Sequence, residues 1–166
     1  MYERGTTVVY FVRHGERIHI PGAPEPHDFS LSEKGKKQAK EVAKKFAKIK
    51  EEIDVIYTSP MKRAYETAVE IGKSVGKKPI ILKGFEEISK KLEKFNYFSL
   101  DYWKALIAFR KKAKIFDKIL ERNGEKVIVL VAHGRLNRML IGKFLGLSYK
   151  NCNRFDAHNC HITLVR

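Results

Sequence analysis

The chain has 166 residues, of which 43% are apolar, and this length and composition fit one folded domain spanning residues 1–166. No apolar run approaches the ~20 residues that a membrane-spanning helix needs. The apolar stretch from Thr7 to Val12 is also too short for a secretory signal. These features exclude a disordered or membrane-spanning chain and predict a cytoplasmic protein.

The net charge is strongly positive, because 34 lysines and arginines stand against 19 acidic residues and give a formal charge of +15. Such a charge favours anionic partners, namely nucleic acid, an acidic surface or phosphorylated small molecules. Eight lysines lie between Lys34 and Lys50, but apolar residues recur among them at helical spacing. We therefore interpret them as the solvated face of an amphipathic helix. Aromatic residues are not interleaved with these lysines, so nucleic acid is not the expected partner.

Short apolar runs rich in β-branched residues alternate with amphipathic stretches along the chain. Strands are predicted over residues 6–12, 54–58, 79–82, 126–132 and 162–165, and helices over 32–50, 60–75, 101–122 and 136–145. This alternation predicts an α/β fold, a three-layer α/β/α sandwich with a largely parallel central sheet.

Local signals mark where the predicted helices begin and end. Ser32 is expected to cap the first helix, and Ser59-Pro60 to start the second with a cap and a proline at its first position. Asn123-Gly124 is expected to end the third. Two long segments, 16–30 and 146–158, have no clear period, and such segments often shape a functional site.

Charged residues cluster just beyond the predicted strands. In open α/β sheets ligands bind beyond the carboxyl ends of the strands. The candidates at these ends are Arg13 and His14 after the first strand, Arg63 after the second, Glu86 and Glu87 after the third, and His133 after the fourth.

This combination of residue types suits phosphoryl transfer. Arginine presents a fork of donors that matches phosphate oxygens. A neutral histidine can attack phosphorus and carry the phosphoryl group, and nearby guanidinium charge keeps it neutral. A glutamate can protonate the leaving oxygen and then activate water. Neither a metal nor another cofactor is required by this scheme.

The same residues carry a family resemblance. The segments involved are Arg13-His14-Gly15-Glu16, Leu31-Ser32-x-x-Gly35-x-x-Gln38-Ala39, Ser59-Pro60-x-x-Arg63-Ala64-x-x-Thr67-Ala68, His133-Gly134 and Asn159-x-x-Ile162-Thr163. In this order they resemble the histidine phosphatase superfamily, also called the phosphoglycerate mutase-like family, over nearly the whole chain. The resemblance implies the α/β sandwich of that family.

The resemblance also implies roles. His14 is similar to the family's phosphorylated nucleophile, Arg13 and Arg63 to its phosphate clamps, and His133 to the second histidine that stabilises the transferring group. Glu87 matches the acid in the family's Arg-Glu-Ile pattern, which reads Glu86-Glu87-Ile88 here. Glu86 is therefore an adjacent competitor.

Three departures from the family pattern bear on substrate binding. Arg17 stands where many members have threonine, and Ile20 where they have asparagine. Arg17 either contacts a doubly charged substrate or points to solvent. Arg135 follows His133 where small or apolar residues are more common, and it is expected to add positive potential. The usual Gly-x-Trp-Glu-Gly is missing, and in its place stand residues expected to cover the site, namely Lys90, Lys91, Lys94, Phe95, Tyr97, Phe98, Tyr102 and Trp103.

The sequence thus predicts a metal-independent phosphatase that acts on a phosphorylated small molecule or phosphoprotein. Its alternatives are a small mutase, for which the chain has little material to exclude water, and a non-catalytic module that binds phosphorylated ligands or nucleic acid. Cys152 and Cys160 form no CxxC pair, which argues against a zinc site and favours two reduced thiols, with a disulfide left open. The sequence predicts no oligomeric state.

Overall fold

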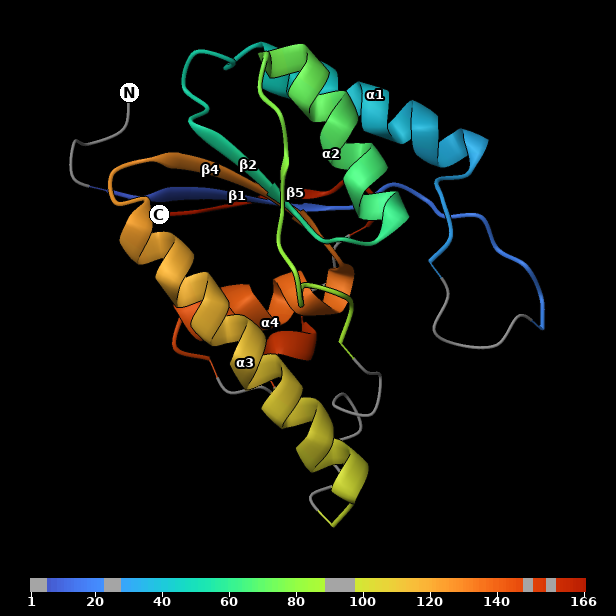
Figure 1. Cartoon of the computed structure of the whole chain (residues 1–166), viewed down its shortest axis with the longest axis vertical. Helices are drawn as coiled ribbons and strands as arrows, with labels where there is room; N and C mark the ends of the chain where they lie inside the picture. The colour runs from blue at the N-terminus through green and yellow to red at the C-terminus, as the bar shows by residue number, and fades with distance from the viewer. Residues whose placement is uncertain (1–5, 23–27, 89–97, 148–150, 155–157) are drawn as a thin grey trace.

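A five-stranded sheet forms the centre of the molecule (Figure 1). The computed structural model describes residues 6–22, 28–88, 98–147, 151–154 and 158–166. The strands are β1 (Val8–Arg13), β2 (Val55–Thr58), β3 (Ile80–Ile81), β4 (Val127–Ala132) and β5 (Ile162–Val165), in the sheet order β3-β2-β4-β1-β5.

All but one of the strands are parallel. β4 pairs in parallel with both β1 and β2, β2 pairs in parallel with β3, and β5 runs antiparallel along β1. Every residue of β4 is buried, which explains its continuous apolar sequence, because both faces of a central parallel strand are covered. The carboxyl ends of β1, β2 and β4 therefore lie side by side at one edge.

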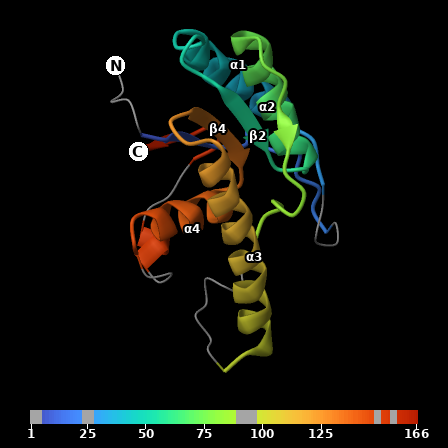
Figure 2. The same ribbon diagram turned by 60° about the vertical axis from the view of Figure 1, so that its left-hand side comes forward.

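Helices cover both faces of the sheet (Figures 1 and 2). α1 (Glu33–Ala47) and α2 (Lys62–Val75) pack on one face, and α3 (Leu100–Arg122) and α4 (Gly134–Phe144) on the other. A short 3-10 helix, η2 (Asn151–Arg154), follows α4. Each face has its own apolar cluster, with Phe46 and Ile71 on the first and Phe109 and Leu136 on the second. The predicted three-layer α/β/α sandwich is confirmed, and none of the described helices is long and apolar enough to cross a membrane.

The predicted helix ends are correct in two cases and wrong in one. The Ser32 hydroxyl oxygen accepts a hydrogen bond from the Gly35 N–H at 3.0 Å and caps α1, and Asn123 ends α3. The prediction that Ser59 caps α2 is wrong, because the helix begins at Lys62 with Met61 at the capping position. The reason is that the Ser59 hydroxyl contacts a histidine of the neighbouring strand end instead of capping the helix.

Candidate active site

Three side chains from three strand ends meet at the carboxyl edge of the sheet. The Arg63 Nε–H donates to Nε2 of His14 at 3.2 Å, and Nη2 of Arg63 lies 3.4 Å from Nδ1 of His133. The two imidazole rings lie 5.2 Å apart between centroids. All three side chains are buried. The structure therefore brings together these predicted site residues, which the sequence separates by 119 positions at most.

The protonation state of His14 follows from its two hydrogen bonds. Nδ1 lies 2.7 Å from the Gly15 carbonyl oxygen, which can only accept, so Nδ1 carries the hydrogen. Nε2 accepts from Arg63 and has no hydrogen of its own. Burial, followed by the charges of Arg63, Arg13 and Arg17, lowers the pKa of His14 to about 3 against the opposing effect of the Gly15 contact. The ring is therefore neutral at neutral pH, with a lone pair on Nε2.

His133 is fully buried and is held from the β2 side. Its Nε2 lies 2.8 Å from the Ser59 hydroxyl oxygen, which also accepts from the Met61 N–H at 3.3 Å. Burial, followed by the charges of His14 and Arg63, holds the pKa of His133 well below its ordinary value. Sequence reasoning missed this contact, although Ser59 stands at the start of a quoted motif, because a serine before a proline reads most simply as a helix cap.

Glu87 lies at the N-terminus of α4. Its carboxylate oxygens accept from the backbone N–H groups of Leu136 at 3.1 Å, Arg135 at 3.4 Å and Ile88 at 3.0 Å. The Arg135 guanidinium lies 3.8 Å away and also donates to the Ile88 carbonyl oxygen at 2.8 Å. Burial raises the pKa of Glu87, against the opposing effect of Arg135 and these N–H groups.

Glu86 has a different environment from its neighbour. Its side chain is 49% exposed, and one oxygen lies 3.1 Å from Nζ of Lys112 on α3. Partial burial would raise the pKa of Glu86, but hydrogen bonds from its own backbone N–H and from Lys112 outweigh this and lower it. Of the two candidate acids, Glu87 is thus the one whose neutral form the protein favours.

Arg13 and Arg17 supply further positive charge. The Arg13 side chain passes beside Gly134, where an added Cβ would lie 3.2 Å from Nε of Arg13. Arg17 is half-buried, with its guanidinium 5.7 Å from the centroid of the Phe29 ring, and its charge lowers the pKa of His14. That Arg17 contacts the substrate stays a prediction.

The loop after β1 is fixed by close contact with the start of α1. A Cβ at Gly15 would lie 2.6 Å from the Gly35 carbonyl oxygen, and one at Gly35 would lie 1.9 Å from that of Glu16. The Glu16 carboxylate accepts from the Ser32 hydroxyl at 2.9 Å, and its backbone N–H donates to the Gln38 side chain at 2.8 Å. These contacts explain why the two glycine-containing motifs occur together. The loop after β1 and the first turn of α1 approach so closely that neither Gly15 nor Gly35 has room for a side chain.

Two more motif residues hold the backbone of the same loop. The Gly15 N–H donates to the Thr67 hydroxyl oxygen at 3.1 Å, and the Asn159 side chain donates to the His14 carbonyl oxygen at 3.0 Å. Thr67 and Asn159 both belong to the family motifs, but the sequence alone assigned them no role. Their contacts orient His14 by fixing both the C=O and the N–H of the peptide group that joins His14 to Gly15.

The predicted covering segment is described only in part. Lys90, Lys91, Lys94, Phe95 and Tyr97 lie outside the described residues. Of the remainder, Tyr102 is buried in the α3 cluster, while Phe98 and Trp103 are exposed. That this segment covers the site remains a prediction.

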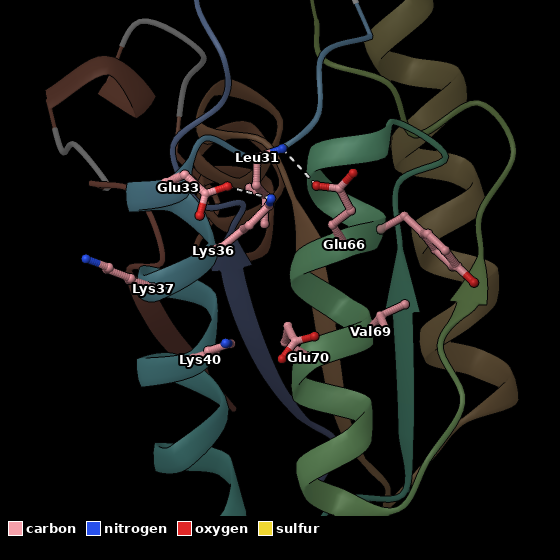
Figure 3. A pocket seen from close by; sticks show the side chains of 9 residues that line it. Leu31, Glu33, Lys36, Lys37, Lys40, Glu66, Val69 and Glu70 are labelled. Atoms are coloured by element: carbon pink, nitrogen blue, oxygen red, sulfur yellow. Dashed lines mark hydrogen bonds and ion pairs between the residues drawn. The ribbon is translucent and has the colours of Figure 1, made fainter.

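A groove of about 530 Å³ lies apart from these residues, between α1 and α2 (Figure 3). It is lined by Leu31, Glu33, Lys36, Lys37, Lys40, Tyr65, Glu66, Val69 and Glu70. Its acidic groups are already engaged: Glu33 with Lys36, Glu66 with the Leu31 N–H, and Glu70 with Lys73. Within the described ranges, no three His, Cys, Asp or Glu side chains gather as a metal site requires.

Two neutral histidines beside arginines at the carboxyl edge of an α/β sheet can bind and transfer a phosphoryl group. The sequence comparison agrees, since residues 9–92 and 106–166 match the model of the histidine phosphatase superfamily (branch 1). The chain belongs to this superfamily, and the predictions of the family and of a phosphatase are confirmed.

Individual relatives are phosphatases as well. Phosphoserine phosphatase 1 of Hydrogenobacter thermophilus is 46% identical over 68 residues, which span 38% of this chain and 30% of that protein. The crystal structure of phosphoserine phosphatase from Entamoeba histolytica, in complex with 3-phosphoglyceric acid, is 26% identical, with a TM-score of 0.75 over 96% of this chain and 90% of the other. A mycobacterial glucosyl-3-phosphoglycerate phosphatase, 20% identical, shares the fold with a TM-score of 0.74 over 95% and 88% of the two chains.

Proposed function

We propose that the chain hydrolyses phosphate monoesters in two steps, with His14 carrying the phosphoryl group between them. The state of the His14 ring is the observation that carries this proposal. Nδ1 is fixed as the hydrogen-bearing nitrogen by the Gly15 carbonyl oxygen, and Nε2 holds a lone pair. A neutral imidazole in this state is a competent nucleophile toward phosphorus.

In the first step, Nε2 of His14 attacks phosphorus in line with the bond to the leaving oxygen, and that bond breaks as the N–P bond forms. Oxygens of the phosphoryl group replace His14 as the acceptor of the Arg63 Nε–H. Arg13 and Arg63 supply positive charge where negative charge develops. Glu87, whose pKa is raised by burial, acts in its protonated form and gives its proton to the leaving oxygen.

His133 assists by holding Arg63 in this step. A guanidinium group can only donate, so Nδ1 of His133 accepts from Nη2 of Arg63 and carries no hydrogen. The hydrogen of the neutral ring is then on Nε2, which donates to the Ser59 hydroxyl oxygen. These two contacts hold the Arg63 guanidinium beside His14, where it meets the transferring phosphoryl group.

In the second step, the Glu87 carboxylate removes a proton from water, whose oxygen attacks phosphorus. The N–P bond breaks, inorganic phosphate leaves, and neutral His14 and protonated Glu87 are restored. Each catalytic group ends the cycle in the protonation state in which it began. Arg13 and Arg63 supply the positive charge that stabilises the phosphoryl group, so the proposal requires no metal.

Phosphorylated small molecules are the substrate class that we propose. Phosphoserine is the first compound to assay, because relatives found by sequence and by structure are phosphoserine phosphatases. Arg17 supports a substrate with a second anionic group, since its charge adds to those of Arg13 and Arg63 at His14.

The proposal is tested by hydrolysis of phosphoserine and p-nitrophenyl phosphate in excess EDTA by the wild type and His14→Ala. We expect turnover by the wild type and a loss of at least ~10³-fold in the variant, as follows when a covalent nucleophile is removed. His158→Ala is the matched control, because His158 is exposed, and it should retain full activity. Activity that survives in His14→Ala, or that EDTA abolishes, contradicts the mechanism.

A further inference from the structure

Lys112 is an unusual residue for its position. It lies on the buried face of α3, between Phe109 and Phe116 in the helical repeat, and it is 9% exposed. Among the residues that the structure describes, no other lysine is buried. Burial of an ammonium group is costly unless the group is paired, and an apolar side chain there would continue the apolar face of the helix.

The ammonium group of Lys112 is engaged by the segment that follows β3. Nζ donates to the Gly84 carbonyl oxygen and lies 3.1 Å from an oxygen of Glu86. Phe85, which follows Gly84, is fully buried, and Ile88 is nearly so. Figures 1 and 2 show the segment after β3 descending beside α3 toward the N-terminal end of α4.

These contacts divide two adjacent carboxylates between two helices. Lys112 of α3 binds Glu86, whereas the N-terminus of α4 binds Glu87. The segment is a loop, in which either glutamate could otherwise turn toward the site. With Glu86 engaged by Lys112 and Gly84 held by the same ammonium group, the backbone presents Glu87 alone to α4.

We propose that Lys112 is a positioning residue, which holds the segment after β3 so that Glu87, and not Glu86, is the proton donor to the leaving group. The proposal rests on the proposed function, in which Glu87 is the acid. It assigns to a buried lysine of α3 a part in catalysis without contact to the substrate. The charge of Lys112 also reaches the site, where it helps to lower the pKa of His133.

The test is the dependence of the rate on the leaving group. Phenyl phosphate and p-nitrophenyl phosphate have similar size, but phenolate is the poorer leaving group and needs protonation more. A displaced acid therefore slows phenyl phosphate more than p-nitrophenyl phosphate. A loss of general structural integrity would slow both substrates equally.

We expect Lys112→Met to lower kcat/KM for phenyl phosphate about tenfold more than for p-nitrophenyl phosphate, a part of the ~10²–10⁴-fold that acid–base catalysis contributes. Its thermal midpoint should not fall, because an apolar side chain replaces a buried charge and the exposed Glu86 carboxylate regains water. Lys111→Met is the matched control, since Lys111 is exposed on the same helix, and it should change neither ratio nor midpoint.

Two further variants separate this inference from the proposed function. Glu87→Gln should show a still larger difference between the substrates, and if it shows none, the proposed role of Glu87 fails. If Glu87→Gln shows the difference, but Lys112→Met lowers kcat/KM equally for both substrates or for neither, the role of Lys112 is overturned. Glu86→Gln should leave the substrate ratio within about twofold of the wild type, because Lys112 still holds Gly84.

Discussion

Gly35→Ala tests the packing that fixes the catalytic loop. On helix propensity alone this change is favourable by about 1 kcal/mol, because alanine replaces glycine in the first turn of α1. The added Cβ, however, would lie 1.9 Å from the Glu16 carbonyl oxygen, and contacts below 3.0 Å essentially never occur. The loop must therefore retreat by about 1 Å, and overpacking of this kind costs about 1–3 kcal/mol.

The displacement also reaches the nucleophile, since Glu16 is two residues from His14. A misplacement of about 1 Å can cost about 10²-fold in rate. We expect Gly35→Ala to lower the free energy of unfolding by up to about 2 kcal/mol in urea denaturation, the overpacking cost less the gain in helix propensity. It should also lower kcat/KM for p-nitrophenyl phosphate by about 10²-fold. Gly124→Ala is the control, because nothing lies within 4 Å of its Cβ. If Gly35→Ala is as stable and as active as the wild type, the reasoning is refuted.

Three further predictions concern the histidines and the helix that carries Arg63. Ser59→Ala removes the hydrogen bond to Nε2 of His133, and kcat should fall about tenfold. Ser74→Ala is the control and should leave kcat unchanged, because the Ser74 hydroxyl donates to the carbonyl oxygens of Ala43 and Ile71, away from the site. The pKa of His14 falls from 6.5 unfolded to about 3 folded, so the unfolded chain binds the extra proton between these values and stability decreases as pH falls through this window. His14→Gln should reduce that slope in urea denaturation, and an unchanged slope would show that His14 is not buried as neutral imidazole. Arg63→Lys should lower kcat/KM by about 10²-fold, because lysine cannot replace the planar fork; an effect below threefold would count against the proposed clamp.

Much of the fold could be predicted because local pattern and tertiary environment agree. The continuous apolar sequence of β4 is that of a strand covered on both faces, and it lies at the centre of the sheet. Capping by Ser32 depends only on its own turn of helix, so this prediction was also correct. The antiparallel placement of β5 depends on pairing with a strand about 150 residues earlier, which no local pattern encodes.

The candidate site was predictable where residues follow strands, as His14 and His133 do. The prediction for Ser59 was wrong because its hydroxyl contacts His133, which is distant in the sequence, and does not cap the nearby helix. Only the nearby helix is evident from the sequence. Lys112 escaped notice because a lysine in a lysine-rich helix reads as solvated. Both are cases in which a long-range polar contact overrides a local preference.

The central claim is a covalent phosphoryl group on His14, and its direct test is rapid quenching during turnover of p-nitrophenyl phosphate, followed by peptide mass spectrometry under alkaline conditions. The account predicts one phosphoryl group on the peptide that contains His14, stable to alkali and lost in acid, as a phosphorus–nitrogen bond requires. It predicts the same adduct in greater amount in Glu87→Gln, because the hydrolysis step lacks its base. A quenched enzyme that turns over without this adduct, or that carries the phosphoryl group on another residue, would contradict the account.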